Sequence, residues 1–368
     1  MTMLALSRVR RAEIDWAAWR KGLFGSPTNV AITAGFAAFL YLVVWPFLRW
    51  ALIDATWRGN AQACSAHGGA CWAFVVEKAR FIVFGLYPHD WQAQPAIAAI
   101  LIIGLVIVTG FPFAWRQGLV TSWIAVIALA VAIMSGLLAG HPVATDKWGG
   151  FPLTVLLAVV GFAGAFPIAI ALALARRSRM GLLRFMAVAI IESVRGVPLI
   201  AVLYVSTLLF PLMLPAGASI DKLLRAQVAI VIFIAAYMAE NVRAGLQAVP
   251  KGQLEAAQAV GLSWSKAMRL VVLPQALRAV IPSFVNLGIG LFLDTTLVIV
   301  IGLFDFLNTA KVAATDPNWL GYYDEAYLFA ALVYFTICFG GSRYSLWLEA
   351  RLARRPAAKT AKRQTKVG

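Results

Sequence analysis

Residues 152–175 read PLTVLLAVVGFAGAFPIAIALALA, a run without a charged side chain. A helix that crosses the hydrocarbon core of a bilayer needs about 20 consecutive apolar residues, so this run is long enough to span a membrane. It is continuously apolar and does not alternate between apolar and polar residues, which predicts a helix rather than a barrel strand. Further runs of this kind give about eight expected spans in all, at 29–52, 94–114, 119–140, 152–175, 185–214, 226–248, 279–305 and 325–348.

The composition of the whole chain supports the same conclusion. Apolar residues make up 61% of the sequence, charged residues only 13%, and the mean hydropathy is +0.81. These values exclude an ordinary soluble globular protein. The sequence therefore predicts an all-α integral membrane protein.

The net charge of +16 reports membrane topology rather than nucleic-acid binding. Most Lys and Arg residues lie in the N-terminal segment, in alternate loops and in the C-terminal tail. The intervening segments hold only Arg49, Arg58, Lys78, Arg80, Lys147, Lys222, Arg225 and Lys311. By the positive-inside rule, we expect both termini in the cytoplasm and no nucleic-acid partner. The basic tail after Arg351 is expected to meet anionic membrane lipid, with nucleic acid as the alternative partner for the tail alone.

The predicted spans divide the chain into segments. Residues 1–28 are too long and too basic to begin a cleaved signal peptide, so we expect a cytoplasmic N-terminal segment before a retained first span. Three spans with a long outside loop, at about 53–93, occupy residues 29–145. Five spans follow in residues 146–350, with a cytoplasmic loop at 249–277, and residues 351–368 form a basic tail.

Two of the three cysteines fall in the long outside loop. Cys64 and Cys71 could form a disulfide if that side of the membrane is oxidising, and two free thiols are the alternative. With His67 they contain metal-ligand types, but four ligands in a convincing pattern are lacking, so no metal site is predicted. Cys338 lies within the last span and is expected to be a packing residue.

Polar residues inside the later spans mark candidate functional positions. A charge in hydrocarbon is costly, so such residues face protein, water or substrate. Glu192 and Arg195 lie on one helix face and either form a structural ion pair or line a gate. The candidate pathway or gate residues are Glu192, Arg195, Glu240, Asp294, Thr295 and Thr296.

The loop at 249–277 carries the most informative pattern. Glu255, Ala256 and Ala257 are followed by Gly261, and then by Leu273-Pro274. Small side chains at helical spacing predict a short helix with a smooth outer face, Gly261 permits a sharp turn, and we expect Pro274 to stop the second helix. The product is a helix-turn-helix along the membrane, suited to dock in a groove of another protein.

This spacing resembles the coupling motif of the membrane subunits of ABC importers. Further segments resemble the polar amino-acid subfamily, of the histidine and glutamine permease type, and they lie at Arg195–Leu199, Ala236–Glu240, Val249–Gln253, Asp294–Leu297 and Ile301–Leu303. The resemblance covers about residues 151–350. The three leading spans are similar to the extension of general amino-acid importers. Val197 replaces the usual Thr, and Leu293 stands where a Lys is common.

The resemblance implies a bacterial inner-membrane permease for amino acids that couples to a separate ATPase dimer through the 255–274 loop. It implies a second permease subunit, expected to be a paralogue in a heterodimer, and a periplasmic amino-acid-binding protein. The implied ATPase contacts are Glu255, Ala256, Ala257, Gly261, Leu273 and Pro274.

No Gly-x-x-x-x-Gly-Lys-Ser/Thr phosphate loop occurs in the sequence. We therefore expect no enzymatic site and no cofactor on this chain, with ATP and Mg on the partner ATPase. The alternative is a secondary transporter driven by an ion gradient, with Glu192, Glu240 and Asp294 as the ion relay, although no inverted repeat is visible. A membrane scaffold protein is a third class.

Overall fold

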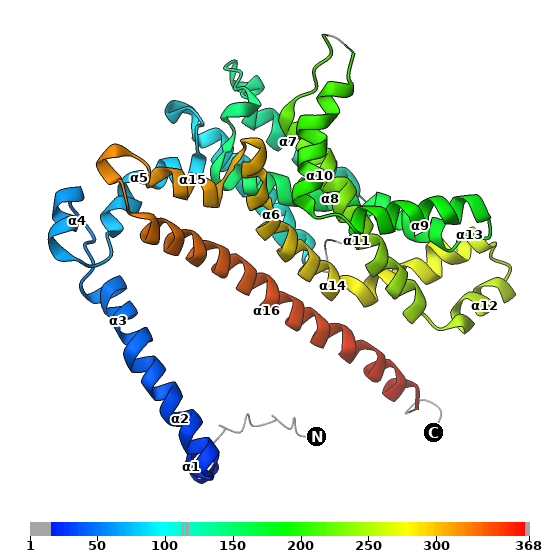
Figure 1. Ribbon diagram of the computed structural model, residues 1–368. Coiled ribbons are helices and arrows are strands. Elements are labelled where there is room, and N and C mark those ends of the chain that lie inside the picture. Colours follow the sequence, from blue (N-terminus) through cyan, green and yellow to red (C-terminus); the bar gives the residue numbers. More distant parts are fainter. Residues whose placement is uncertain (1–15, 112–113, 115–117, 216, 365–368) are drawn as a thin grey trace, which may run out of the picture. The chain divides into compact units, whose positions relative to one another are not determined.

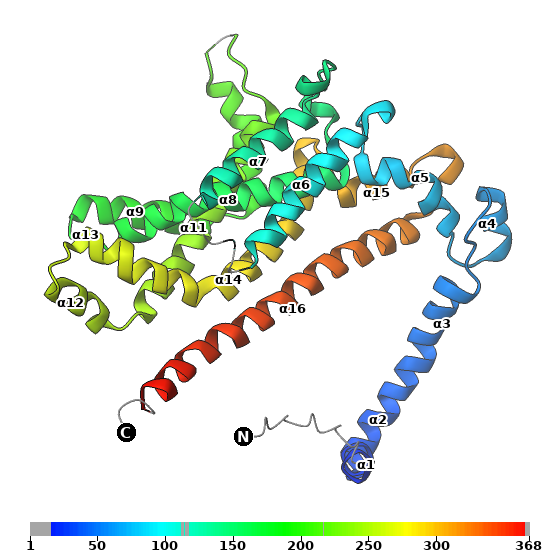
Figure 2. The ribbon, with the colours of Figure 1, turned by 180° about the vertical axis from the view of Figure 1, so that it is seen from behind.

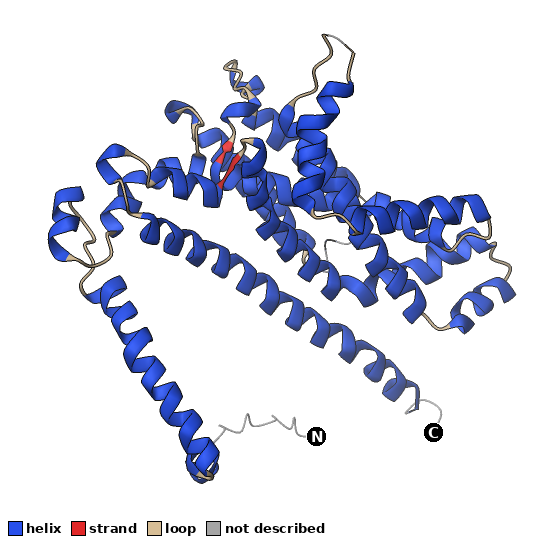
Figure 3. Ribbon diagram, in the orientation of Figure 1, coloured by secondary structure: helices blue, strands red, loops and turns tan. Residues whose placement is uncertain are grey.

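The computed structural model describes residues 16–111, 114, 118–215 and 217–364, which are almost entirely helical (Figure 3). The prediction of an all-α membrane protein is confirmed. The chain separates into two compact units, Met1–Phe74 and Val75–Gly368, here called unit 1 and unit 2. The segment boundary expected at residue 145 remains a prediction. The beginning of the expected N-terminal segment, residues 1–15, and the end of the expected tail, residues 365–368, lie outside the described residues.

Unit 1 is built around one long apolar helix. After α1 (Trp16–Phe24), the span Pro27–Ile53 runs through α2 (Pro27–Phe39), η1 (Leu40–Val44), α3 (Trp45–Leu48) and η2 (Arg49–Ile53). Ser26 caps its start, because its hydroxyl accepts a hydrogen bond from the Asn29 N–H at 3.1 Å. The loop beyond it contains α4 (Ala61–His67), and a disulfide joins Cys64 to Cys71.

Among its described residues, unit 2 contains four further helices that are long and apolar enough to cross a membrane. They are α8 (Gly150–Arg176), α11 (Lys222–Ala248), the helix Trp264–Ile301, and the Tyr323–Ala350 part of α16 (Tyr323–Gln364). Two shorter apolar helices, α6 (Ala93–Thr109) and α7 (Leu119–Met134), occupy the second and third predicted spans. The helix α5 (Trp72–Phe84) contains the boundary between the two units. Figure 1 labels α5 and α15 (Phe306–Ala313), and the other short elements are η3 (His89–Trp91), η5 (Leu137–Ala139), η6 (Thr145–Lys147), β1 (Phe304–Asp305) and η11 (Pro317–Trp319).

The span predicted at 185–214 is not one straight helix. It consists of α9 (Gly181–Arg195) and a second arm, Leu199–Met213, bent by 102° from the first. The second arm is made of α10 (Leu199–Tyr204), η7 (Val205–Leu209) and η8 (Phe210–Met213). The break falls at Gly196–Pro198. Pro198 has extended backbone angles and lacks the N–H that would continue the helix, so α9 ends there and α10 begins in a new direction.

The expectation that Pro274 stops a helix is wrong. The helix Trp264–Ile301 runs without a break through α13 (Trp264–Ala267), η9 (Met268–Val272), α14 (Leu273–Asp294) and η10 (Thr295–Ile301). Pro274 lies in the first turn of α14, directly after a π-helical turn closed by the Leu273 N–H and the Met268 carbonyl. Such a wide turn makes room for the proline ring, which would clash in a regular α-helix.

The same arrangement occurs at two other prolines. The π-helical turns η1 and η7 lie directly before Trp45-Pro46 and Phe210-Pro211, and each is closed by a hydrogen bond from residue i to residue i−5. A proline in a regular helix interior costs about 3 kcal/mol or more. The chain therefore continues its helices past these prolines by widening the preceding turn.

Small residues bring the helices of unit 2 close together. Ala165, Ala169 and Ala173 repeat every four residues on α8 and are completely buried. A β-carbon added at Gly161 would lie only 2.7 Å from a methyl carbon of Ile230 on α11. Small residues allow such close packing between membrane helices. The core of unit 2 is thus centred on α8 and α11.

The buried carboxylate of Asp305 holds several elements together near the start of α8. Asp305 follows the long helix, and its backbone pairs with Gly150 in an isolated β-bridge. Its carboxylate accepts hydrogen bonds from the Asn308 backbone at 3.2 Å and from the Tyr334 hydroxyl at 3.0 Å. Burial raises the pKa of Asp305, while these hydrogen bonds oppose the rise. Asp305 therefore caps α15 and anchors it to α8 and α16.

Candidate functional site

The segment expected to couple to a partner forms a compact helix-turn-helix. Its first helix is α12 (Lys251–Ala259), and its turn contains Gly261 at φ +87°. The Leu262 N–H donates to the Ala257 carbonyl at 3.2 Å, which closes the turn before α13 begins. Positive φ is the region that glycine adopts at little cost, so this turn explains the glycine. Figures 1 and 2 show α9, α12 and α13 together at one end of unit 2.

The helix-turn-helix exposes only part of the predicted contact face. Glu255, Ala256, Val260 and Gly261 are exposed, with Val260 at 78%. Ala257 is instead buried, which corrects the expectation that all the small residues of this stripe face outward. Ala257 therefore holds α12 against the rest of unit 2, and its neighbours form the free surface.

One side-chain hydrogen bond ties α12 to α14, and a second bond holds the same glutamine to its own helix. The Gln275 side-chain amide donates to the Gln253 side-chain oxygen at 3.2 Å and to the Val271 carbonyl at 2.9 Å. Gln275 follows Pro274 by one residue, so this contact lies where α14 starts. Leu273 and Pro274 are half-buried within the continuous helix. These two residues are therefore less accessible to a docking partner than Glu255 and Ala256 are.

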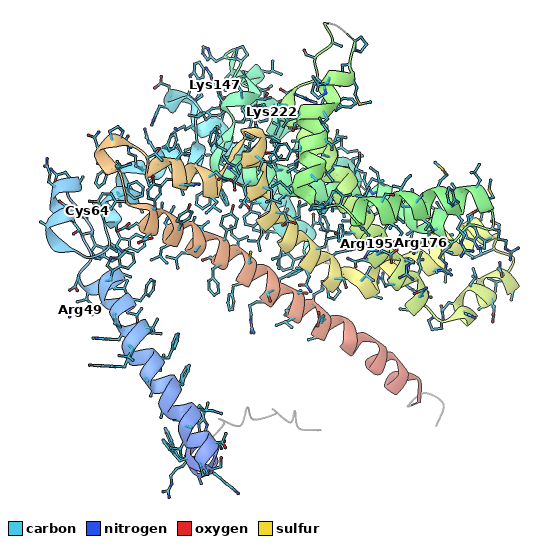
Figure 4. All side chains as sticks on the ribbon, viewed as in Figure 1. Arg49, Cys64, Lys147, Arg176, Arg195 and Lys222 are labelled. Carbon is cyan, nitrogen blue, oxygen red and sulfur yellow. A yellow bond between two sulfur atoms is a disulfide. The ribbon has the colours of Figure 1, made fainter. Side chains whose placement is uncertain are left out.

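Three of the predicted pathway residues meet in an ion network. Arg176, the last residue of α8, donates to Glu192 of α9 at 2.9 Å and to Glu240 of α11 at 2.5 Å. Arg243 also pairs with Glu240, at 2.8 Å. The side chains of Arg176 and Glu240 are only 23% and 16% exposed. The network therefore ties three helices together at one end of unit 2, well away from Lys147 and Lys222 (Figure 4).

Arg195 takes part in this network only weakly. Its distance to Glu192 is 3.9 Å, much longer than the distance from Glu192 to Arg176. Its guanidinium instead lies over the ring of Tyr237, 5.5 Å from the centroid, which is within the range of a cation–π interaction. Glu192 therefore has Arg176 as its main partner, and Arg195 packs on α11.

Asp294, Thr295 and Thr296 lie apart from the ion network along the long helix. Asp294 is the last residue of α14, about 27 Å along the helix axis from Ala276 near its start. Thr295 is buried and Thr296 half-buried, and both hydroxyls bond to backbone carbonyls three residues earlier. Asp294 is half-buried and has no hydrogen-bond or ion-pair partner among the residues that the structure describes. It is available to water or to a ligand.

Sequence reasoning missed Arg176 and Arg243 as members of the site. In the sequence, both are indistinguishable from the other charges that report topology. The available signals were the position of Arg176 at the end of an apolar run, and the spacing of Glu240 and Arg243, which repeats the spacing of Glu192 and Arg195. It also missed the buried Asp305, whose only signal was an acid directly before a short helix.

Comparison with known proteins identifies the class of this membrane protein. Residues 165–354 match the family described as the binding-protein-dependent transport system inner membrane component. The chain belongs to this family, and it is therefore the membrane permease subunit of an ABC transport system. This assignment gives no support to an ion-gradient-driven transporter.

Among its relatives, an inner membrane amino-acid ABC transporter permease protein of Escherichia coli, YhdY, is 46% identical and aligns over 90% of this chain and 91% of its own length. The glutamate/glutamine/aspartate/asparagine transport system permease protein BztC of Rhodobacter capsulatus is 34% identical, over 93% and 94% of the two chains. A crystal structure of an amino acid ABC transporter with histidines matches 55% of this chain and 92% of that chain, with 30% identity and a TM-score of 0.49.

Proposed function

We propose that this permease carries amino acids across the bacterial inner membrane and is driven by a separate ATPase that docks on α12. The amino-acid substrate is supported by two relatives that align over nearly their whole length and are named for amino-acid transport. The observation that carries the ATPase docking is the exposed surface of α12 and its turn, formed by Glu255, Ala256, Val260 and Gly261.

The packing around α12 would transmit a push from the ATPase as a rigid-body movement. α12 follows α11 directly through Val249-Pro250, and α13 continues without a break into α14. α11 and α14 are themselves in close contact, since a β-carbon at Gly245 would lie 2.5 Å from the Ala276 carbonyl oxygen. A displacement of α12 would therefore move α11 and α14 together.

The ion network would act as a clamp on this movement. It joins α8, α9 and α11 through Arg176, Glu192 and Glu240, and Figure 4 places Arg176 at the end of unit 2 where Figure 1 labels α12. If α11 moves relative to α8 and α9, the bonds to Arg176 must break or exchange. We assign to this network the role of stabilising one state of the transport cycle, while Asp294, Thr295 and Thr296 line the path near the other end of α14.

The complete transporter would contain an ATPase dimer that holds ATP and Mg, a second and paralogous permease, and a periplasmic amino-acid-binding protein. The positive-inside distribution supports both termini in the cytoplasm, on the side of the coupling loop. The chain itself would then bind no nucleotide, and its role would be to gate the path.

Charge reversal on α12 tests this proposal. Glu255 is exposed and has no ion-pair partner among the described residues, so Glu255→Lys leaves the fold of the permease intact. We expect the variant to insert normally, to lose most ATPase during purification, and to lose amino-acid uptake. Glu349→Lys is the matched control, because Glu349 is an exposed acid on α16 outside the coupling segment. Full recovery of the ATPase with the Glu255 variant would overturn the docking assignment.

A further inference from the structure

A basic pocket of about 430 Å³ lies between α8, α9 and α11. It is lined by Arg176, Arg177, Arg184, Val188, Arg243 and Gln247. Four guanidinium groups thus surround one cavity, and such a concentration of planar donors is suited to bind an anion with several oxygen atoms.

The carboxylates near the pocket do not balance its charge. Glu240 pairs with Arg176 and Arg243, and Glu192 pairs with Arg176. Two carboxylates therefore serve four arginines. Arg177 donates only to the Leu246 carbonyl, at 3.2 Å, and Arg184 has no hydrogen-bond or ion-pair partner in the part of the chain that the structure describes. The pocket keeps a net positive charge with free donors.

The position of the pocket favours a lipid headgroup as the source of the anion. Arg176 ends the apolar helix α8, and Gln247 lies in the last turn of α11, so the pocket lies where two spans leave the hydrocarbon. α9, which contributes Arg184, also exposes large apolar side chains: Leu182 is 76% exposed and Phe185 is 67% exposed. Leu182 and Phe185 do not line the pocket and lie on other faces of α9 than Arg184, so α9 offers a basic face for the phosphate and separate apolar faces for the surrounding acyl chains.

We propose that this pocket binds the phosphate of an anionic phospholipid headgroup. The phosphate would lie between Arg177 and Arg184, with Arg176 and Arg243 behind them. Because Arg176 also holds Glu192 and Glu240, a bound phosphate would compete for this arginine and weaken the clamp between α8, α9 and α11. Anionic lipid would thereby change the balance between the states of the permease. The binding itself requires only that the chain spans a membrane, and not any particular substrate.

The test is native mass spectrometry of the purified transporter with added dioleoyl-phosphatidylglycerol, dioleoyl-phosphatidylcholine or inorganic phosphate. We expect phosphatidylglycerol to remain bound to the wild type and phosphatidylcholine to dissociate. Arg177→Gln and Arg184→Gln should each weaken phosphatidylglycerol binding about fivefold, since one arginine near a membrane surface contributes about 1 kcal/mol to binding. Arg177→Lys and Arg184→Lys, which keep the positive charge, should retain most of the phosphatidylglycerol binding. Arg179→Gln is the matched control, because Arg179 is exposed in the loop that follows Arg177 but does not line the pocket.

Several outcomes would contradict phospholipid binding in this pocket. Equal retention of both lipids, or equal losses in the Arg177, Arg184 and Arg179 variants, would overturn the site. Displacement of phosphatidylglycerol by millimolar inorganic phosphate would show that a soluble phosphate is the ligand instead. If the Arg177 and Arg184 variants keep the lipid but lose the ATPase on purification, the pocket is a protein-docking surface and the lipid proposal fails. Failure of ATPase docking in the Glu255 variant leaves the lipid measurement unaffected, so the two proposals are tested separately.

Discussion

Removal of Arg176 should loosen the contact between α8, α9 and α11 by an amount that the structure allows us to estimate. Arg176 donates to Glu192, which is 52% exposed, and to Glu240, which is 16% exposed. An ion pair to an exposed carboxylate contributes about 0–1 kcal/mol. A hydrogen bond between charged groups away from water contributes about 1.5–3 kcal/mol. Glu240 keeps Arg243 as a partner, so it does not become an isolated buried charge.

We therefore expect Arg176→Met to lower the free energy of unfolding by about 2–3 kcal/mol, mostly through Glu240. A double-mutant cycle measures this directly, with Arg176→Met, Glu240→Gln and the double variant unfolded by denaturant in mixed micelles. The coupling energy between Arg176 and Glu240 should be about 1–2 kcal/mol, and that between Arg176 and Glu192 should be smaller. Arg179→Met, outside the network, is the control and should be neutral.

If the effects of Arg176→Met and Glu240→Gln simply add to within about 0.5 kcal/mol, Arg176 and Glu240 are not coupled, because independent sites behave in that way. A larger coupling energy of Arg176 with Glu192 than with Glu240 would equally contradict the dominant role of Glu240. ATP hydrolysis by the complete transporter gives a second measurement. If the network stabilises the resting state, the Arg176 variant should hydrolyse more ATP without substrate than the wild type does, and an unchanged basal rate would remove the clamp from the mechanism.

Three further predictions concern single positions. Gly261→Ala should destabilise the α12–α13 turn by about 1–2 kcal/mol because of its positive φ, while Gly261→Asn should recover most ATPase binding in a pull-down. Gly245→Ala should cost about 1–3 kcal/mol of unfolding free energy, since its β-carbon would overlap the Ala276 carbonyl. The hydrogen bond from Lys78, at 2.7 Å, lowers the pKa of Asp316, so this contact stabilises the fold fully above the ordinary aspartate pKa of about 4 and is lost as the pH falls through the lowered pKa. Amide hydrogen exchange near Asp316 should therefore become faster only in that acid range. The Asp316→Asn variant should show no such pH dependence.

The spans could be predicted from the sequence because an uncharged apolar run such as 152–175 has only one stable form in a bilayer, the helix. Their geometry could not. Mean hydropathy averages over the side chains of a segment and contains no information on the direction of the helix axis. The 102° bend at Gly196–Pro198 lies inside one apolar run and therefore could not be predicted from hydropathy. Pro274 misled the prediction for a related reason, since nothing in the residue pattern shows that the preceding turn will widen by one residue.

The candidate site was predictable in part. Glu192 and Glu240 stand out because charges inside apolar runs need a partner. The partner that they share, Arg176, lies 16 and 64 residues away from them in sequence. Periodicity along one helix cannot show a contact between three helices. An arginine at the end of a span is also common as a topology signal, so its second role became visible only when the packing of α8 against α9 and α11 was known.

The continuity of the helix through Pro274 gives the proposed coupling its physical basis. The helix Trp264–Ile301 has 38 residues, about 57 Å of rise, whereas a bilayer core is crossed by about 20 residues. The excess lies at the end next to α12, so one continuous helix, with Pro282 inside it, reaches from the α12 turn to Asp294. If Pro274 ended the helix, a hinge there would absorb a push on α12 before it reached the membrane. Because the π-helical turn at Met268–Val272 preserves the helix, the proposed push on α12 would be carried to Asp294, a half-buried carboxylate without a partner among the described residues.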